Sequence, residues 1–378
     1  MSNCKNPIIT PSFPARRAEE RLCITNINID DIDLSDETFK ISSDKSLYDN
    51  DPASFDKSLS SLAASINSIG LINLPILQKI GSDDKICNGE LEHKPYRVVS
   101  GFRRVSAMKL IGMRDIPASI ILFSDEASLL PPQELQFAIT AISDNAFQRQ
   151  LNTMEQARGV HLLKKFISVE EIAGSSSAIF NMNMNRALIN MLDDIANMPA
   201  SVHRVVENER LAMGAALKLR QYGYDDDVID SFVRLFSKIK TSLNKQKEII
   251  TNIHEIAARE NISVTDVINA KEIREIVDNS ADGADENRKG NLLRSILFEQ
   301  RYPNLSKAKE QFNINLKLLN SQGDLKGGIK LEPPADFEGR DYTISFKFSN
   351  VDDLAQNADA ISALSKNRLL DQIISSNL

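Results

Sequence analysis

One stretch, residues 96–112, constrains the fold most, because one periodicity gives way to another within it. Tyr96–Ser100 is rich in β-branched residues and predicts a buried strand, whereas residues 105–111 repeat apolar side chains at the spacing of one helix face. Gly101 lies at the change from strand to helix, where a residue without a side chain lets the backbone approach a ligand. Unbonded N–H groups at the start of a helix favour an anion, so this stretch predicts a phosphate-binding turn.

Two arginines, Arg103 and Arg104, follow in the first turn of the predicted helix. Guanidinium groups bind phosphate oxygens through paired hydrogen bonds, which strengthens the prediction of a polyphosphate site. The same residues also fit an ordinary strand, turn and helix with two solvated arginines, because short turns that contain glycine are common. Spacing alone leaves both interpretations open.

The residues of this stretch resemble the phosphate-binding box of the ParB family. Ser100-Gly-Phe-Arg-Arg104 is followed by Leu110-Ile-Gly112 and Asp115-Ile-Pro-Ala118, whereas the family has Gly-Glu-Arg-Arg followed by a similar helix, a glycine and Ile-Pro-Ala. Phe102 stands here in the place of the glutamate. The resemblance implies a domain that binds CTP, with these candidate ligands: Gly70, Asn73, Gly101, Arg103, Arg104 and Asn145.

Two flanking stretches extend the resemblance. Ser54–Ile69 is amphipathic and predicts a helix that ends at Gly70, and Asn73 then occupies the place usually held by glutamine near the nucleotide base. The second stretch, Asp144-Asn-Ala-Phe-Gln-Arg-Gln-Leu-Asn152, resembles the Glu-Asn box of the family, with its arginine displaced by one residue to Arg149.

Asp144 and Asn145 are the candidate metal ligands. A carboxylate and an amide side by side can bind Mg²⁺ together with waters and phosphate oxygens. From the residues alone, an ordinary helix end with an Asp-Asn pair is the alternative. Phe102 and Asp144 in place of glutamates, and the displaced Arg149, predict slow or negligible CTP turnover and leave open a weak CTP hydrolase.

A helix-turn-helix is predicted after residue 151. Asn152 or Thr153 begins a helix that runs to Phe166, Ser168-Val-Glu-Glu171 is a capping box, and Gly174–Ser177 predicts a turn before a helical pattern that runs to Met198. The ParB family has a helix-turn-helix in this place. Asparagine can read adenine, yet it is also common on exposed helices. The candidate DNA-binding residues are Ser175, Asn181, Asn183, Asn185, Arg186 and Asn190.

Composition excludes several classes of protein. The 378 residues suggest two or three domains, and no apolar run approaches the length of about 18 residues that a membrane span needs. Three scattered cysteines and four separated histidines predict a reducing compartment without a structural metal. The net charge of −7 argues against a uniformly basic protein but allows a local DNA-binding face.

The predicted fold class has three parts: an α+β N-terminal domain like those of ParB and sulfiredoxin, an all-α middle domain with the helix-turn-helix, and a small α+β C-terminal segment. The predicted boundaries are a flexible tail at 1–21, the nucleotide-binding domain at 22–150, the helical DNA-binding domain at 151–277, a linker at 278–291 and a dimerisation segment at 292–378.

The resemblance implies a partition protein for chromosome or plasmid segregation. Such a protein is a cytoplasmic, nucleoid-associated homodimer that clamps onto DNA at a centromere-like site with CTP and Mg²⁺, with a ParA-like ATPase as partner. Two alternatives remain: a ParB-fold transcriptional regulator without nucleotide switching, and a small-molecule kinase. Sulfiredoxin chemistry is excluded because Phe102 replaces the required cysteine. The DNA sequence bound, and a chromosomal, plasmid or phage origin, are not determined by these residues.

Overall fold

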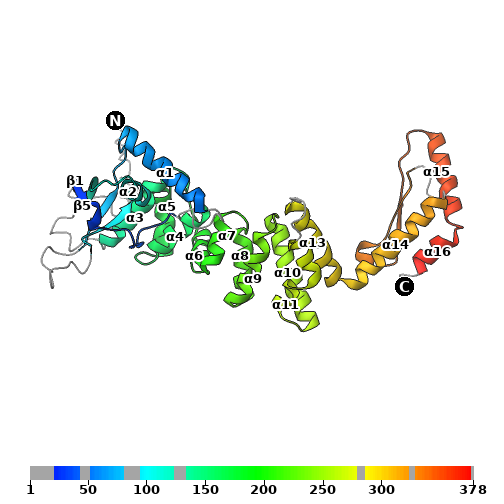
Figure 1. Cartoon of the computed structure of the whole chain (residues 1–378). Helices are drawn as coiled ribbons and strands as arrows, with labels where there is room; N and C mark the ends of the chain where they lie inside the picture. The colour runs from blue at the N-terminus through cyan, green and yellow to red at the C-terminus, as the bar shows by residue number, and fades with distance from the viewer. Residues whose placement is uncertain are drawn as a thin grey trace, which may run out of the picture. The chain divides into compact units, whose positions relative to one another are not determined.

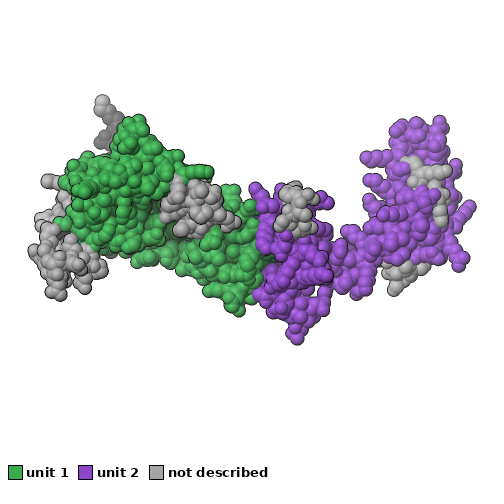
Figure 2. Space-filling view, in the orientation of Figure 1, with its two compact units in different colours: residues 1–237 green, residues 238–378 purple. Residues whose placement is uncertain are grey.

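The computed structural model describes residues 21–42, 52–80, 94–122, 133–278, 286–322 and 328–375. The predicted tail therefore lies outside the described residues, apart from Arg21. The chain divides into two compact units, residues 1–237 and 238–378 (Figure 2). This division falls within the range predicted as one helical domain, and the domain boundaries stay predictions.

The first unit begins with a mixed sheet of five strands in the order β1-β5-β3-β4-β2. β1 pairs antiparallel with β5, β3 pairs parallel with β5 and antiparallel with β4, and β2 pairs parallel with β4. The strands are β1 (Arg21–Asn28), β2 (Ile32–Asp33), β3 (Ile76–Lys79), β4 (Tyr96–Ser100) and β5 (Asp115–Leu122).

Two helices pack together beside this sheet, α1 (Pro52–Ile69) and α2 (Phe102–Leu110) (Figure 1). Their apolar faces join the β-branched residues of the central strands in one core, because burial of apolar surface drives their association. The fully buried members of that core include Ile32, Leu77, Val98, Val105, Met108 and Ile116. This packing fixes the turn between β4 and α2.

A run of short helices completes the first unit. α3 packs against β4 and α5, and α4 packs against α6 and α7. Capping boxes open both α4 and α5, at Asn152 with Glu155 and at Ser168 with Glu171. These helices are α3 (Gln133–Ala146), α4 (Thr153–Leu163), α5 (Val169–Phe180), α6 (Arg186–Ala196), α7 (Ala200–Glu207), α8 (Met213–Gln221) and α9 (Asp226–Ser237).

The second unit starts with four helices and ends with a small α+β part. α13 buries Leu293 and Leu297 and packs against α10 and α12. Three helices and one strand share a separate core that contains Phe312, Leu331 and Leu364, and a second short strand pairs antiparallel with the first. The elements are α10 (Leu243–Glu260), α11 (Val264–Ile268), α12 (Lys271–Asp278), α13 (Glu286–Arg301), α14 (Pro303–Gln322), β6 (Lys330–Glu332), β7 (Thr343–Ser345), α15 (Val351–Leu364) and α16 (Arg368–Ser375).

The fold class predicted from the sequence is confirmed: an α+β N-terminal part, a helical middle part and a small α+β C-terminal part. Gly112 has φ +78° and follows Ile111, the C-cap of α2, as expected of a glycine that ends a helix. In the part of the chain that the structure describes, no helix is long and apolar enough to span a bilayer.

The predicted turn at Gly174–Ser177 is wrong. These residues lie inside α5, which continues to Phe180, and the turn falls at residues 181–185. The serine hydroxyls allow this, because Ser175 Oγ donates to the Glu171 carbonyl at 2.6 Å and Ser176 Oγ donates to the Ala173 carbonyl at 3.0 Å. Serines bonded in this way are accommodated in a helix rather than in a turn.

Candidate functional site

The turn between β4 and α2 has the geometry of an anion site. Gly101 precedes the helix with φ +98°, a conformation that residues with a side chain rarely adopt. A Cβ atom at this position would lie 3.0 Å from Arg104 Nε and 3.1 Å from Pro75 Cα. Gly101 offers no side-chain cap to α2, so no side chain bonds the first N–H groups of the helix at its positive end.

Arg104 extends from the first turn of α2 to the segment before β3. Its Nη1 donates to the carbonyl oxygens of Asn73 at 3.0 Å and Leu74 at 2.9 Å, and its Nη2 lies 3.2 Å from Asp144 Oδ2. The Arg104 side chain is only 17% exposed. The structure thus brings together the predicted residues Asn73, Gly101, Arg104 and Asp144.

Asp144, near the end of α3, receives three hydrogen bonds. Besides Arg104, the donors are the buried Ser100 hydroxyl, which also bonds Oδ2, and Gln148 Nε2, which lies 2.9 Å from Oδ1. The carboxylate therefore joins the ends of β4 and α3 to the first turn of α2. Sequence reasoning missed Ser100 and Gln148, although Ser100 directly precedes the glycine and Gln148 lies one helical turn after Asp144.

The other predicted nucleotide ligands do not join this cluster. Arg103 Nη2 donates to Ser58 Oγ on α1 at 2.6 Å, and Asn145 Nδ2 donates to the Ala141 carbonyl of its own helix at 2.8 Å. Gly70, with φ +80°, ends α1 in open space. Phe102, in the place of the family glutamate, is 9% exposed and lies in the core rather than at the turn.

The residues proposed to bind Mg²⁺ do not fit a metal as they are arranged. Both Asp144 oxygens accept hydrogen bonds from protein donors, one of them a cation, and the Asn145 side chain is bonded to its own helix. Elsewhere in the described residues, no group of three or more His, Cys, Asp or Glu side chains could hold a metal.

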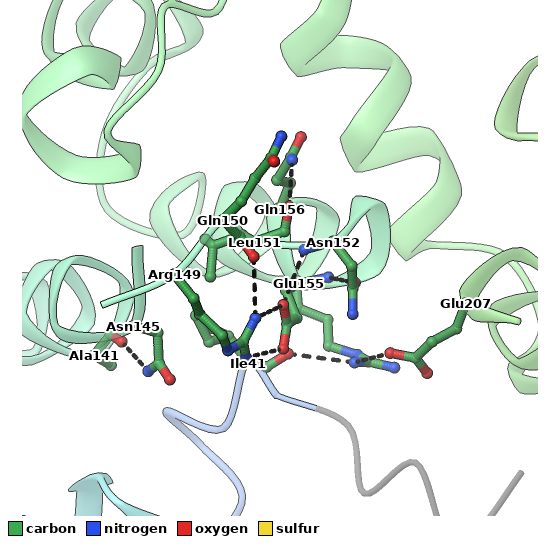
Figure 3. A network of polar contacts seen from close by, with 11 residues as sticks. Ile41, Ala141, Asn145, Arg149, Gln150, Leu151, Asn152, Glu155, Gln156 and Glu207 are labelled. Carbon is green, nitrogen blue, oxygen red and sulfur yellow. Dashed lines mark hydrogen bonds and ion pairs between the residues drawn. The ribbon is translucent and has the colours of Figure 1, made fainter. Parts of the chain in front are cut away.

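Arg149 makes a second cluster at the junction of α3 and α4 (Figure 3). Its two terminal nitrogens lie 2.7 and 2.5 Å from the two carboxylate oxygens of Glu155, whose side chain is 4% exposed. Glu155 also accepts from the Asn152 N–H at 2.9 Å. Hydrogen bonding to Glu155 raises the pKa of Arg149 above its usual range. Arg149, the displaced arginine of the stretch that resembles the Glu-Asn box, is thus bonded to Glu155 in the first turn of α4.

A further arginine links three segments of the first unit. Arg158 on α4 lies 3.3 Å from the Ile41 carbonyl and 3.5 Å from the buried carboxylate of Glu207 on α7 (Figure 3). The arginine therefore ties the segment after β2 to the helices that follow the sheet. No pattern in the sequence indicated these partners, which are 117 and 49 residues away along the chain.

The candidate DNA-binding residues surround the turn between α5 and α6. Asn181 ends α5 with φ +54°, and Asn185 caps α6 by accepting from the Leu188 N–H at 2.8 Å. Asn183, Arg186 and Asn190 are exposed. Ser175 is 7% exposed and its hydroxyl is bonded to its own helix, so its side chain is not on the surface with the other candidates.

The same turn is held by a residue that sequence reasoning missed. The buried Ser176 Oγ accepts from the Met184 N–H at 3.0 Å, and Met184 itself is 3% exposed. Two helices joined by this fixed turn present the start of α6, with the exposed Arg186 and Asn190, on the surface. Arg186 Nη1 lies 3.3 Å from Glu170 Oε1, and both of these side chains are more than half exposed.

The fold and the turn define the class of protein: an α+β domain with an anion-compatible helix start, followed in the same unit by short helices.

A probable plasmid-partitioning protein ParB from Deinococcus radiodurans is 22% identical over 210 residues, which are 54% of this chain and 63% of the relative. A probable chromosome-partitioning protein ParB from Neisseria meningitidis serogroup A is 26% identical over 165 residues, 43% of this chain and 49% of the relative.

The predicted resemblance to the ParB family of partition proteins is therefore confirmed. The chain spans about half to two thirds of the length of these curated relatives. No protein-family model matches the chain.

Two solved structures are also similar. A pNOB8-like ParB N-domain aligns with 74% of this chain and 100% of its own at 14% identity, with a TM-score of 0.32. A C-terminally truncated ParB from Caulobacter crescentus, complexed to the centromeric parS site, aligns with 59% of this chain and 96% of its own at 15% identity, with a TM-score of 0.30.

Proposed function

We propose that this chain is a ParB-like partition protein that binds CTP at the turn between β4 and α2 and DNA at the turn between α5 and α6. The observation that carries the proposal is the uncapped start of α2, where Gly101 and Arg104 lie beside each other. Backbone donors, a helix dipole and a guanidinium are the groups that bind a polyphosphate. The curated relatives, named as partitioning proteins, add support for the biological role.

Calorimetry of the full chain with each of the four nucleoside triphosphates tests the nucleotide. CTP should bind, and Arg104→Ala should lose about 1.5–3 kcal/mol of binding free energy, the scale of a charge-assisted hydrogen bond. Arg220→Ala is the matched control, since Arg220 makes a half-exposed ion pair with Asp194 far along the chain. Equal binding of all four nucleotides, or of none, would contradict the choice of CTP.

The proposal includes Mg²⁺ as an ion bound with the triphosphate, and its ligation by Asp144 and Asn145 would need both side chains to exchange their present partners for the cation. The same titration in EDTA tests it, because a bound cation would bridge protein and phosphate oxygens. Unchanged affinity for CTP in EDTA would show that nucleotide binding does not require Mg²⁺. A tenfold or greater loss in EDTA would show that the triphosphate binds together with the cation.

DNA binding is proposed for the exposed residues near the start of α6. A site selected from random duplexes should yield one preferred sequence, which fluorescence anisotropy can then measure at several salt concentrations. Asn190→Ala should lose about 1–3 kcal/mol for that sequence, as expected for a base contact. Asn197→Ala is the control, because Asn197 is exposed just beyond the other end of α6 and bonded to the Asp193 carbonyl. Equal losses for the two variants would contradict base contact by Asn190.

Dimerisation is proposed for the C-terminal α+β part. It has its own core, and it exposes apolar side chains that a second copy could cover: Ile344, Phe348, Val351 and Leu354. The sedimentation test compares the full chain with one that ends at Tyr302, because a cut before α13 would strip its packing from α10. A shortened chain that stays dimeric at low micromolar concentration would place the main contact elsewhere.

Partition further implies a ParA-like ATPase partner and a cytoplasmic, nucleoid-associated location. A chromosomal or plasmid gene next to this one that encodes such an ATPase would supply the partner for a binding assay. Fluorescently tagged protein should form foci on the nucleoid, and a diffuse signal in cells that carry the selected site would contradict this role.

The second candidate is a DNA-binding regulator without nucleotide switching. One observation favours it: Asp144 already compensates the charge of Arg104. The calorimetry separates the two candidates, since the regulator binds its DNA site but no triphosphate. If CTP binds, its turnover should be slow or negligible, which phosphate release in the presence of DNA measures.

A further inference from the structure

The ion pair between Arg104 and Asp144 lies beside Gly101, at the turn where a phosphate group is proposed to bind. The guanidinium has five N–H donors. Nη1 is directed at two backbone carbonyls and Nη2 at the carboxylate, so a phosphate that binds through Nε and Nη2 would share Nη2 with Asp144 and bring a second anion to one guanidinium. Both side chains are at least three-quarters buried, which limits screening by solvent.

Asp144 is also held from its other sides. Ser100 Oγ shares Oδ2 with Arg104, and Gln148 bonds Oδ1 at 2.9 Å. Gln148 lies directly before Arg149, which is bonded to Glu155 at the start of α4. A change at Asp144 is therefore passed along the end of α3 toward the junction with α4.

We infer that Asp144 is an internal anion that competes with the nucleotide polyphosphate for Arg104, so that nucleotide binding releases the end of α3. This inference rests on the proposed nucleotide site and adds its regulation. It assigns Asp144 a role opposite in sign to that of a metal ligand. A metal ligand strengthens nucleotide binding, whereas a competing carboxylate weakens it and in return couples binding to the α3–α4 junction.

The test is Asp144→Asn in the full chain, titrated with CTP and separately with inorganic tripolyphosphate, each in EDTA and in Mg²⁺. Asparagine keeps the shape of the side chain and removes the charge. Asp194→Asn is the matched control: it makes the same charge change at an ion pair of 3.6 Å with Arg220, and its affinity should equal that of the unmodified protein. Asp144→Asn should bind both probes about fivefold tighter in EDTA.

Amide hydrogen exchange supplies a readout that does not depend on affinity. Peptides covering residues 139–151 should exchange faster in Asp144→Asn without ligand than in the unmodified protein. CTP should raise the exchange of these peptides in the unmodified protein and change it little in the variant.

Several results would overturn the inference. Weaker binding by the variant in Mg²⁺ alone would identify a metal ligand, and weaker binding in both buffers would identify a residue that only orients Arg104. Equal affinity, or no binding of tripolyphosphate by either protein, would also overturn it. If tripolyphosphate binds and CTP does not, the choice of nucleotide is refuted. The affinities of the unmodified protein and of Asp144→Asn for tripolyphosphate would still test the competition by Asp144.

Discussion

Replacement of Arg149 by methionine separates a structural arginine from a phosphate ligand. The resemblance to the ParB box places an arginine near the nucleotide, whereas the structure holds Arg149 against Glu155. Arg149→Met keeps the length of the aliphatic side chain and removes the guanidinium. We expect the variant to lose stability and to keep its affinity for CTP.

The magnitude follows from the exposure of the two partners. Removing one member of a fully buried ion pair costs about 3–5 kcal/mol, whereas an exposed pair is worth about 0–1 kcal/mol. Glu155 is 4% exposed and Arg149 is 49% exposed, so the pair lies between these limits. Glu155 keeps its bond from the Asn152 N–H, which lowers the cost. We therefore expect a loss of about 2 kcal/mol, or about 4–8 °C in the melting temperature.

Urea unfolding of the variant and of the unmodified protein measures this loss, and calorimetry measures CTP binding. A double-mutant cycle with Glu155→Gln should give a coupling energy above about 1 kcal/mol, since the two residues are in direct contact. Arg220→Met is the control and should change stability by less than about 0.5 kcal/mol. A variant of unchanged stability that has lost CTP binding would show that Arg149 leaves Glu155 for the phosphate, and would refute the structural role.

Three further predictions concern single residues. Phe102→Glu should cost more than about 3 kcal/mol in urea unfolding, because the side chain is in the core; a stable variant would contradict its burial. Gly101→Ala should cost about 1–3 kcal/mol because φ is +98°, whereas Gly174→Ala, in an open helical position, should be neutral or stabilising; equal effects would refute the strain. Burial lowers the pKa of His203, so its contribution to stability is present above about pH 6.5 and lost as pH falls; the urea midpoint should fall from pH 7 to 5, and less in His203→Gln.

Local features of this protein were predictable from neighbouring residues. The glycine between strand and helix, the glycine that ends α2 and the capping boxes at Asn152 and Ser168 all act through atoms within four residues of each other. The apolar spacing of residues 105–111 likewise indicated the buried face of α2. Such interactions form in the same way wherever the segment lies, so the sequence alone predicts them.

The partners of the polar side chains were decided by tertiary structure. Arg104 and Asp144 are 40 residues apart, and only the packing of α3 against β4 brings them within 3.2 Å. The same packing brings Asp144 within hydrogen-bonding distance of the Ser100 hydroxyl. The Phe102 side chain packs in the core and not at the turn, where its position in the phosphate-binding box suggested a role.

The turn between α5 and α6 is another feature whose position was decided by tertiary structure and not by neighbouring residues. The serines at 175–177 predict a turn by composition, because serine hydroxyls often bond to turn backbone. In the folded protein Ser175 and Ser176 bond instead to helical carbonyls and are buried, and Ser176 also binds the Met184 N–H. A hydroxyl can satisfy either arrangement locally. Which one it adopts depends on the apolar neighbours that bury Ile172, Ile179 and Phe180, and those neighbours are assembled only by the fold.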